Sequence, residues 1–450
     1  MSLPVVPPAP PASRAGSSSA ALSVRGGLAY GLLGLPLAFV ALPLYVILPN
    51  HYAKEFGMPL AVLGAILLGA RLFDALIDPL LGRLIDRLFA RSTASVLRLG
   101  AAAAVVLGLG FALLFFPPLA VQASAAGLGL WAGATLVLAY AGYSALSVAH
   151  QSWGAMLGGD EAQRSRIVAW REGLGLLGVV LASVAPSMLG LPATTGLFFI
   201  ALLAGWLAWC RAPRPVAAGQ HGEPTLQSMS QPGALWRPLR LPNFRRLLAV
   251  FMLNGIASAV PATLVLFFIQ DRLQAPPAME PLFLGSYFLS AALSIPLWLA
   301  LVKRLGLART WLVGVLLAIT VFGWASQLLA GQHVAFALVC ALSGVALGAD
   351  LALPGALLAG VIQANGDAGR AEGAYFGWWN FATKLNLALA AGLALPLLGL
   401  FGYAPGSRSN AALSALVVAY CILPCLLKLA AAASAWFLLV HPTPMKVTSP

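Results

Sequence analysis

Three charged residues lie close together within one long apolar stretch of this sequence, RLFDALIDPLLG. They are Arg71, Asp74 and Asp78. Asp74 and Asp78 are four positions apart, so on a helix their carboxylates lie on one face, one turn from each other. Two such carboxylates repel each other when both are ionised, and a shared proton or a bound monovalent cation relieves that repulsion. The spacing therefore predicts a cation-coupling site, in which Arg71 compensates one charge when the cation leaves.

A lysine lies within a second long apolar stretch, residues 373–400. Lys384 is about twelve residues into that stretch, too deep for its ammonium group to reach either membrane surface easily. It therefore requires an anionic partner, and the candidates are Asp350 or the pair of Asp74 and Asp78.

Both groups of charges also have a purely structural interpretation. Arg71 and Asp74 could neutralise each other on a packed helix face, and Lys384 could form a static bridge with Asp350. We favour the coupling site because the first alternative explains only two of the three charges and leaves Asp78 without a partner. Burying an unpaired charge in a bilayer costs a few kcal/mol even on the lenient insertion scale.

The elements that carry these charges are membrane-spanning helices. The chain has 450 residues, of which 60% are hydrophobic and only 9% charged, and its mean hydropathy is +0.90. A typical soluble domain is about 25% charged. Apolar runs of at least about 18 residues predict transmembrane helices. The twelve predicted spans are residues 28–48, 59–81, 99–117, 127–150, 173–190, 193–210, 247–270, 281–302, 310–331, 334–362, 373–400 and 411–440. Lys428 lies within the last of them, and its role is left open.

The net charge of +13 reflects membrane topology rather than nucleic-acid binding. Most Lys and Arg residues fall in the alternate intervals that lie on the same side as the N-terminus. By the positive-inside rule this side is the cytoplasm, so we expect a multi-pass protein of the inner (plasma) membrane with both termini inside. We expect the protein to be embedded in the lipid bilayer and to bind a small-molecule substrate.

The predicted spans divide into six and six. The longest polar interval, residues 211–246, contains GQHGEPTLQSMSQPG, which is typical of a linker. It separates a predicted bundle at 27–210 from a second bundle at 247–442. Residues 1–26 are Pro-, Ser- and Ala-rich and are predicted to be a disordered cytoplasmic tail, and residues 443–450 a second tail. Two such halves are expected to bind substrate at their interface, near the midplane.

Four stretches resemble a known family. GRLIDR, residues 82–87, resembles the cytoplasmic loop signature of the major facilitator superfamily. Three longer stretches resemble the glycoside-pentoside-hexuronide:cation symporters, the melibiose carrier family, at helix two, the loop after helix four, and helix eleven. They are RLFDALIDPLLG, DEAQRSRIVAWREGLGLLG and EGAYFGWWNFATKLNLALAAGLALPLLGLFGY. The resemblance implies an all-α membrane protein with the major facilitator fold, twelve transmembrane helices in two six-helix bundles, and cation-coupled transport by alternating access.

The resemblance also implies roles for single residues. In the family, the helix-eleven lysine, here Lys384, lies near the cation and sugar sites and helps to link them. Ser144 falls where the family has a hydroxyl ligand for the cation. The loop residues Gly82, Asp86 and Arg87 correspond to the gating loop.

The candidate substrate-binding residues lie in three predicted helices or their ends. Arg171 is the nearest match to an arginine that contacts the sugar in the family, although a charge pair with Glu172 at a helix end explains it equally well. Tyr375 is one helical turn before Trp378 and Trp379, and the three could stack on a ring or could simply pack as interface anchors. The fifth candidate is Gln151, near a position where the family has a second helix-four acid.

Departures from the family leave the substrate open. The first predicted span has no charge, whereas sugar-binding members have an acid there, and the span-ten segment reads AGVIQ instead of an acid-bearing motif. A sugar or glycoside is the expected solute, and an amphiphile or lysolipid is the alternative within the same fold. A membrane-embedded transferase for lipid-linked substrates is disfavoured because the predicted outer loops are short and poor in acids. The protein is therefore expected not to be an enzyme, and to be a monomer.

The coupling ion is predicted to be H⁺ rather than Na⁺. Sodium-using relatives have an asparagine directly before the second helix-two acid, and this chain has Ile77. Sodium prefers a shell of oxygen ligands, whereas a proton needs one carboxylate. No metal ion or other cofactor is expected, because His150 and His333 lie near span ends without clustered ligands.

Overall fold

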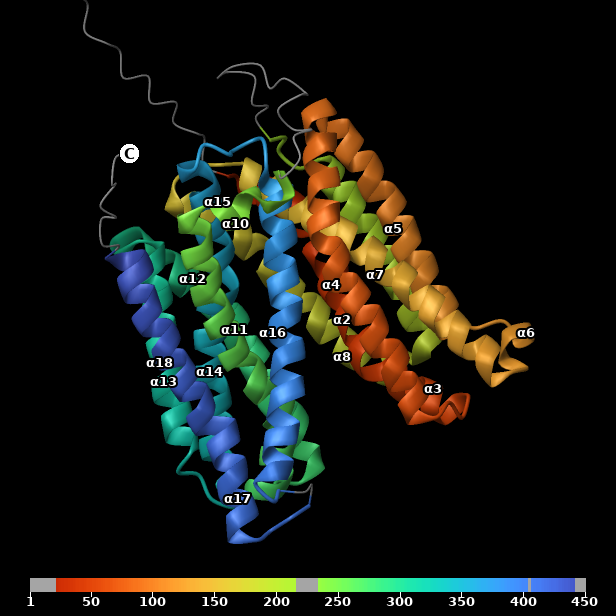
Figure 1. The fold of residues 1–450 in the computed structure, drawn as a ribbon, viewed down its shortest axis with the longest axis vertical. Helices are drawn as coiled ribbons and strands as arrows, with labels where there is room; N and C mark the ends of the chain where they lie inside the picture. The colour runs from red at the N-terminus through yellow and green to blue at the C-terminus, as the bar shows by residue number, and fades with distance from the viewer. Residues whose placement is uncertain (1–21, 216–233, 404–405, 442–450) are drawn as a thin grey trace, which may run out of the picture.

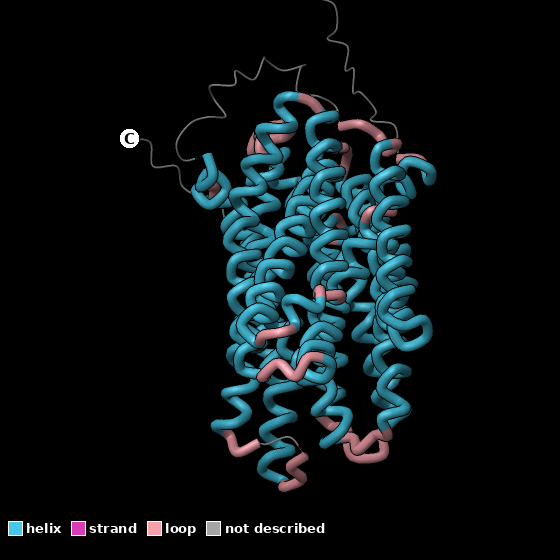
Figure 2. The backbone as a smooth tube through the Cα atoms, turned by 90° about the vertical axis from the view of Figure 1, so that its right-hand side faces the viewer, coloured by secondary structure: helices cyan, strands magenta, loops and turns pink. Residues whose placement is uncertain are grey.

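The computed structural model describes residues 22–215, 234–403 and 406–441, and every regular element in this part of the chain is helical (Figures 1 and 2). The predicted tail at 443–450 and most of the predicted tail at 1–26 lie outside the described residues, as does the centre of the predicted linker.

The first predicted bundle consists of six spans. The first span is built from four short pieces in sequence, because prolines at positions 36, 43 and 49 each remove a backbone donor. The elements are α1 (Val24–Gly31), α2 (Gly34–Leu42), η1 (Pro43–Ile47), α3 (Leu48–Glu55), α4 (Leu60–Arg91), α5 (Thr93–Phe115), α6 (Leu119–Gln122), α7 (Ala125–Met156) and α8 (Glu161–Cys210). The fifth and sixth predicted spans are two helices that share the label α8 and are separated at Gly190, whose φ of 77° is a conformation that suits a residue without Cβ.

The second bundle repeats this plan after the linker. Its elements are η2 (Ala234–Trp236), α10 (Arg237–Arg240), α11 (Pro242–Phe267), η3 (Phe268–Arg272), η4 (Pro277–Met279), α12 (Glu280–Leu305), α13 (Leu307–Ala325), α14 (His333–Ala352), α15 (Pro354–Ala364), α16 (Glu372–Leu400), α17 (Asn410–Val417), η5 (Val418–Ile422), α18 (Leu423–Ala435) and η6 (Trp436–Val440). Helix α11 begins at Pro242, so the last residues assigned to the linker already belong to the seventh span.

Twelve helical spans result, as predicted. Ten stretches of the described chain are long and apolar enough to cross a bilayer. The other two spans are α4 and α16, with 32 and 29 residues, and they carry Asp74, Asp78 and Lys384, whereas Asp350 lies on α14 and Lys428 on α18. The all-α fold with two six-helix bundles is thus confirmed.

The two bundles touch most closely where α4 crosses α16. A Cβ on Gly82 would lie 2.0 Å from the carbonyl oxygen of Gly373, and a Cβ on Gly377 would lie 2.6 Å from that of Asp78. Glycine at these positions therefore lets the two backbones approach directly. This contact lies toward the end of the molecule where α10 and α15 lie, at the top of Figure 1, and we call it the linker end. The ribbons of α4 and α16 diverge toward the opposite end (Figure 1).

Candidate functional site

Lys384 lies between the two carboxylates of α4. Its Nζ is 2.7 Å from Oδ1 of Asp74 and 2.8 Å from Oδ2 of Asp78. Both acids are buried, with 2% and 0% of their surfaces exposed. The one-turn spacing of the acids on α4 puts both carboxylates within reach of one ammonium group. Because α4 belongs to the first bundle and α16 to the second, these ion pairs join the two bundles.

Ser144 of α7 completes this cluster. Its hydroxyl donates to Oδ1 of Asp74 at 2.6 Å and accepts a hydrogen bond from Lys384 Nζ at 2.7 Å. Lys384 also donates to the backbone oxygen of Asp74, at 3.2 Å. Three of the residues predicted for cation coupling, together with Lys384, therefore lie in contact with one another. We call Asp74, Asp78, Ser144 and Lys384 the coupling cluster.

The coupling cluster has room for one more positive charge. Two carboxylates and one ammonium leave a formal charge of −1 in a buried place. Oδ1 of Asp78 accepts no hydrogen bond from any described residue. A buried acceptor without a donor is unfavourable, and a proton or a small cation at this oxygen would satisfy it and neutralise the cluster.

Arg71 and Asp350 each have a neighbour other than Lys384. Arg71 lies beside the hydroxyl of Tyr140 on α7. Asp350 pairs with Lys428 of α18, whose Nζ is 3.3 Å from Oδ2. The alternative of a static bridge between Lys384 and Asp350 is therefore not formed in this structure.

Asp350 and Lys428 belong to a second buried polar group, which the sequence analysis did not assemble. Oδ1 of Asp350 accepts hydrogen bonds from Asn254 at 2.9 Å and from the Trp311 indole at 2.8 Å. Lys428 Nζ donates to Oδ1 of Asn254 at 2.8 Å. The position of Lys428 within an apolar span could have indicated this group, because a lysine at such a position needs a buried anion as its partner.

The predicted aromatic face is packed within the second bundle. Tyr375 donates its hydroxyl to Asp367 at 2.8 Å, and the Trp378 indole donates to a backbone oxygen at Leu235 at 2.8 Å. Trp379 stacks on Phe251 with ring centroids 3.7 Å apart. These contacts match the packing interpretation of the three aromatic residues.

Arg171 and Gln151 line a small space between the bundles, of about 10 Å³. Arg171 is largely buried and forms an ion pair with Glu172 at 2.5 Å. The pair of the structural interpretation is therefore formed, but it lies inside α8, which begins at Glu161, rather than at a helix end. Gln151 donates to the hydroxyl of Ser147 at 3.0 Å. Both side chains thus lie on the interface, in a region that is closed in this structure.

The loop signature closes the linker end. The carboxylate of Asp86 accepts the backbone N–H groups of Gly373 and Ala374, at 2.6 and 2.9 Å, and so caps the first turn of α16 across the bundle interface. Gly82 makes the close backbone contact, and Arg87 is exposed. Burial and the neighbouring Glu372 hold the pKa of Asp86 well above its usual range.

Two further contacts join the bundles at the linker end, and the sequence analysis did not single them out. Glu161, in the first turn of α8, accepts the backbone N–H of Leu307 at the start of α13, at 2.8 Å. Arg164 donates to the amide oxygen of Gln363 on α15. Both residues of α8 lie in the stretch DEAQRSRIVAWREGLGLLG, so the motif itself was the available signal.

The architecture is that of known transporters. The chain superposes on a major facilitator superfamily transporter, FucP, crystallised in an outward conformation, with a TM-score of 0.64, 14% identity, and coverage of 92% of this chain and 98% of that one. Two bundles with a buried charged cluster at their interface define a membrane transporter of the major facilitator fold, and family and fold point to a transporter rather than an enzyme.

The chain belongs to the family described as MFS/sugar transport protein, whose model matches residues 24–441. It is similar to the uncharacterized symporter YjmB of Bacillus subtilis, with 24% identity over 416 residues, which is 87% of this chain and 86% of that protein. It is also similar to the putative glycoside/cation symporter YagG of Escherichia coli, with 28% identity over 173 residues, 38% of this chain and 35% of that protein. These relatives fit the glycoside-pentoside-hexuronide resemblance.

Proposed function

We propose that this protein is a cation-coupled symporter for a sugar or glycoside, and that the coupling cluster binds the driving ion. The carrying observation is the position of Lys384 between Asp74 and Asp78, at 2.7 and 2.8 Å, across the interface of the two bundles. The printed names of the relatives, one a symporter and one a putative glycoside/cation symporter, support this assignment.

The cluster suggests how ion binding is linked to movement. In the empty protein the ammonium of Lys384 holds the two bundles together through the α4 carboxylates. A cation at the free Oδ1 of Asp78 weakens the attraction between that carboxylate and the ammonium, because the carboxylate then needs less positive charge from α16. Ion binding thus weakens one of the contacts between the bundles and lowers the barrier to their rocking between two orientations.

The coupling ion is proposed to be H⁺. The side chain directly before Asp78 is the hydrocarbon of Ile77, which supplies no oxygen. Among the oxygens of the cluster itself, one position is already filled by Lys384, and Tyr140 and Tyr143 add hydroxyls near the acids. One carboxylate oxygen suffices for a proton, whereas Na⁺ requires several oxygens around it.

We propose that the linker end faces the cytoplasm and that the structure is an outward-facing form. The distribution of Lys and Arg supports the orientation. The contacts of Asp86, Glu161 and Arg164 between the bundles all lie at the linker end, and they keep it closed. In this orientation the protein resides in the plasma membrane with both termini inside.

The solute is proposed to be less polar than a free sugar. The first span, from α1 to η1, is without a charged residue after Arg25, so the carboxylate that would bind sugar hydroxyls is missing there. A glycoside with an apolar substituent fits this departure and the family together. A lysolipid or other amphiphile is the competing solute.

Uptake into proteoliposomes tests the coupling role. Asp78→Asn keeps the shape of the side chain but removes its charge, so accumulation of glycoside driven by an inward proton gradient should be lost, while exchange of solute without a gradient persists. The matched control is Asp160→Asn at the N-cap of α8, where asparagine caps as well as aspartate.

Undiminished uphill uptake by Asp78→Asn would refute the coupling role. Uptake that requires sodium and does not respond to a proton gradient would refute H⁺ as the ion while leaving the symporter assignment in place. Transport of lysolipid but of no glycoside would show that the solute is an amphiphile rather than a glycoside.

A further inference from the structure

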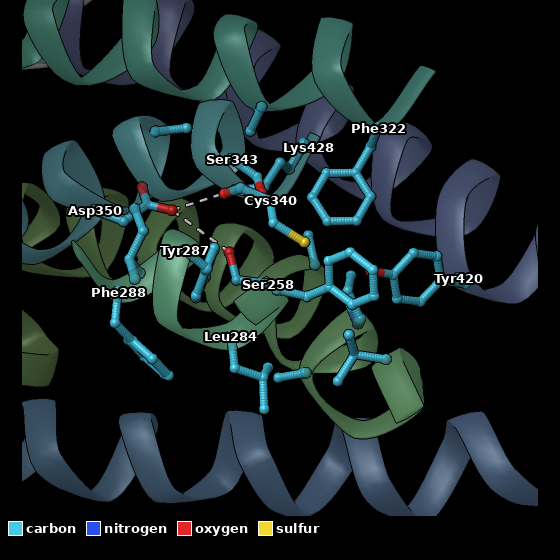
Figure 3. Close-up of a pocket in the computed structure, with 18 residues that line it drawn as sticks. Ser258, Leu284, Tyr287, Phe288, Phe322, Cys340, Ser343, Asp350, Tyr420 and Lys428 are labelled. Atoms are coloured by element: carbon cyan, nitrogen blue, oxygen red, sulfur yellow. Dashed lines mark hydrogen bonds and ion pairs between the residues drawn. The ribbon is translucent and has the colours of Figure 1, made fainter. Parts of the chain in front are cut away.

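A cavity of about 180 Å³ lies inside the second bundle, away from the coupling cluster. Helices α11, α12 and α14 form most of its wall. Five aromatic side chains line it: Phe283, Tyr287, Phe288, Phe322 and Tyr420. Figure 3 shows the rings of Phe322 and Tyr420 on one side and the charged residues Asp350 and Lys428 toward the other. We call it the aromatic cavity.

The polar end of the aromatic cavity is already neutral. Asp350 receives hydrogen bonds from Asn254 and Trp311 on one oxygen, and on the other it contacts Lys428 at 3.3 Å and the Ser258 hydroxyl at 3.5 Å. A carboxylate with this many donors has no need of an added cation. The polar end of the aromatic cavity therefore differs from the coupling cluster, where one oxygen of Asp78 accepts no hydrogen bond.

Lys428 still has a donor to offer. An ammonium group has three N–H bonds, and the acceptors of Lys428 are Asn254 Oδ1 and Asp350 Oδ2. The third N–H is available to an oxygen of a ligand in the cavity. Ser258 adds a hydroxyl whose contact with Asp350 is at the limit of hydrogen-bond length.

The size and the wall chemistry select the ligand. An engineered cavity of about 150 Å³ lined by apolar side chains binds benzene, so the aromatic cavity can hold one six-membered ring. The hydroxyl of Ser343 is committed to the backbone oxygen of Val339 at 2.7 Å. Only Tyr287 and Tyr420 among the five rings carry a hydroxyl, so a sugar ring would leave some of its own hydroxyls against hydrocarbon, where an unpaired polar group costs free energy.

The aromatic cavity lies next to the surface between the bundles. Phe288 and Leu347 line it and also pack against the small apolar cluster in which Ala169 and Leu176 of α8 meet α12. Helix α16 provides a second connection. Asn386, two residues after Lys384, is packed so tightly on α11 that a Cβ on Gly255 would lie 2.1 Å from its amide nitrogen. A ligand in the cavity thus contacts elements that must move together during transport.

We propose that the aromatic cavity binds an uncharged aromatic ring bearing an oxygen substituent, with that oxygen at Lys428 and Ser258. Resting on the proposed function, this ring is the aryl aglycone of the transported glycoside. The preferred solute is then an aryl glycoside rather than a free sugar or an alkyl glycoside.

Binding of 4-fluorophenol tests the cavity without any assumption about transport. The probe has the ring and the oxygen, and its binding to the purified full-length protein is followed by fluorine NMR against empty micelles. Ala262 lines the cavity and is exposed, so Ala262→Phe fills the space without burying a strained side chain. The control is Leu266→Phe, one turn along α11 at an exposed position that does not line the cavity.

Binding to the wild type and to Leu266→Phe, with affinity reduced at least about tenfold in Ala262→Phe, supports the cavity. Absence of binding to the wild type, or equal binding to Ala262→Phe, overturns it. Ser258→Ala should weaken binding of 4-fluorophenol more than that of fluorobenzene, which lacks the oxygen.

Competition with glycosides then separates the two proposals. Phenyl and methyl glycosides of glucose, galactose, xylose and glucuronic acid compete for bound 4-fluorophenol, and one phenyl glycoside should displace it at a concentration at least about tenfold lower than its methyl counterpart. Equal displacement by both overturns the aglycone assignment. If 4-fluorophenol binds in the cavity but no glycoside displaces it or is transported, the cavity stands and the glycoside function fails.

Discussion

A single methyl group at Gly82 should open the linker end. In Gly82→Ala the new Cβ would lie 2.0 Å from the carbonyl oxygen and 2.7 Å from the carbonyl carbon of Gly373, so α4 and α16 must separate by roughly 1 Å to reach normal contact. The bonds from Gly373 and Ala374 to Asp86, now 2.6 and 2.9 Å, would then exceed hydrogen-bond length. Each such bond contributes about 0.5–1.5 kcal/mol when the carboxyl of Asp86 is neutral and about 1.5–3 kcal/mol when it is charged. Loss of the pair, after partial relaxation, should favour the open linker end by about 3 kcal/mol, roughly a hundredfold in population.

Thiol labelling measures this change. Gln151→Cys places a reporter in the closed space between the bundles, in a chain whose native cysteines are replaced at positions 210, 340, 421 and 425. In inside-out vesicles a membrane-impermeant maleimide should react with it many times faster in Gly82→Ala. The matched control is Gly69→Ala on the same helix, where a Cβ meets no atom within 4 Å and labelling should not change. An unchanged rate in Gly82→Ala would refute the reasoning.

Three further outcomes are expected. Ser144→Ala removes a hydroxyl bonded to both Asp74 and Lys384, so the apparent affinity for the coupling ion in uptake assays should fall about tenfold, and Ser144→Thr should restore it; no change would remove Ser144 from the site. Lys428→Met should lower the unfolding free energy by about 3–5 kcal/mol, and adding Asp350→Asn should recover part of it; a double variant less stable than the single one would contradict the pairing. Burial raises the pKa of Glu372 from 4.5 to about 7 when the linker end is closed. As pH falls from about 7 toward 4.5, the closed form therefore binds a proton at Glu372 and is stabilised relative to the open form. This stabilisation is lost as pH rises above 7. Labelling at position 151, divided by the labelling rate of an exposed thiol, should therefore slow as pH falls through 7. The free-energy difference between the closed and open forms changes by at most about 1.4 kcal/mol per pH unit for one proton. A rate ratio that does not depend on pH would refute the linkage.

The fold could be predicted because the hydropathy and charge of a short segment are sufficient to identify a membrane-spanning helix. Twelve apolar spans, and the charges within some of them, follow from windows of about 20 residues. The break between the fifth and sixth spans was predicted as a short interval after residue 190, and the structure separates the two helices at Gly190. A single residue with positive φ is sufficient to end the first helix there.

The pairing of charges was predicted only in part. The i and i+4 spacing fixed that Asp74 and Asp78 share a face, and the structure brings Lys384 to both. The choice between those acids and Asp350 depended on how each helix is rotated about its axis, which depth in the membrane does not determine. Asp350 pairs with Lys428 instead, so Lys384 of α16 can point toward α4.

Spacing was least informative for the aromatic residues of α16. One turn between Tyr375 and the tryptophans predicts neighbouring rings, but the contact partners come from α11, η2 and the chain after α15. Such partners are remote in sequence, so the pattern could not tell an open stacking surface from a packed one.

The charge of the coupling cluster determines which half of the transport cycle responds to voltage. With two carboxylates and Lys384 the empty cluster carries −1, and with one monovalent cation it is neutral. Under the proposed mechanism the loaded protein therefore reorients without moving net charge, and the empty protein carries its negative charge back. A potential that is negative inside drives that return toward the outer surface, by up to about 2.3 kcal/mol per 100 mV if the charge crosses the whole field. Membrane potential should then accelerate turnover under net uptake and leave solute exchange unaffected.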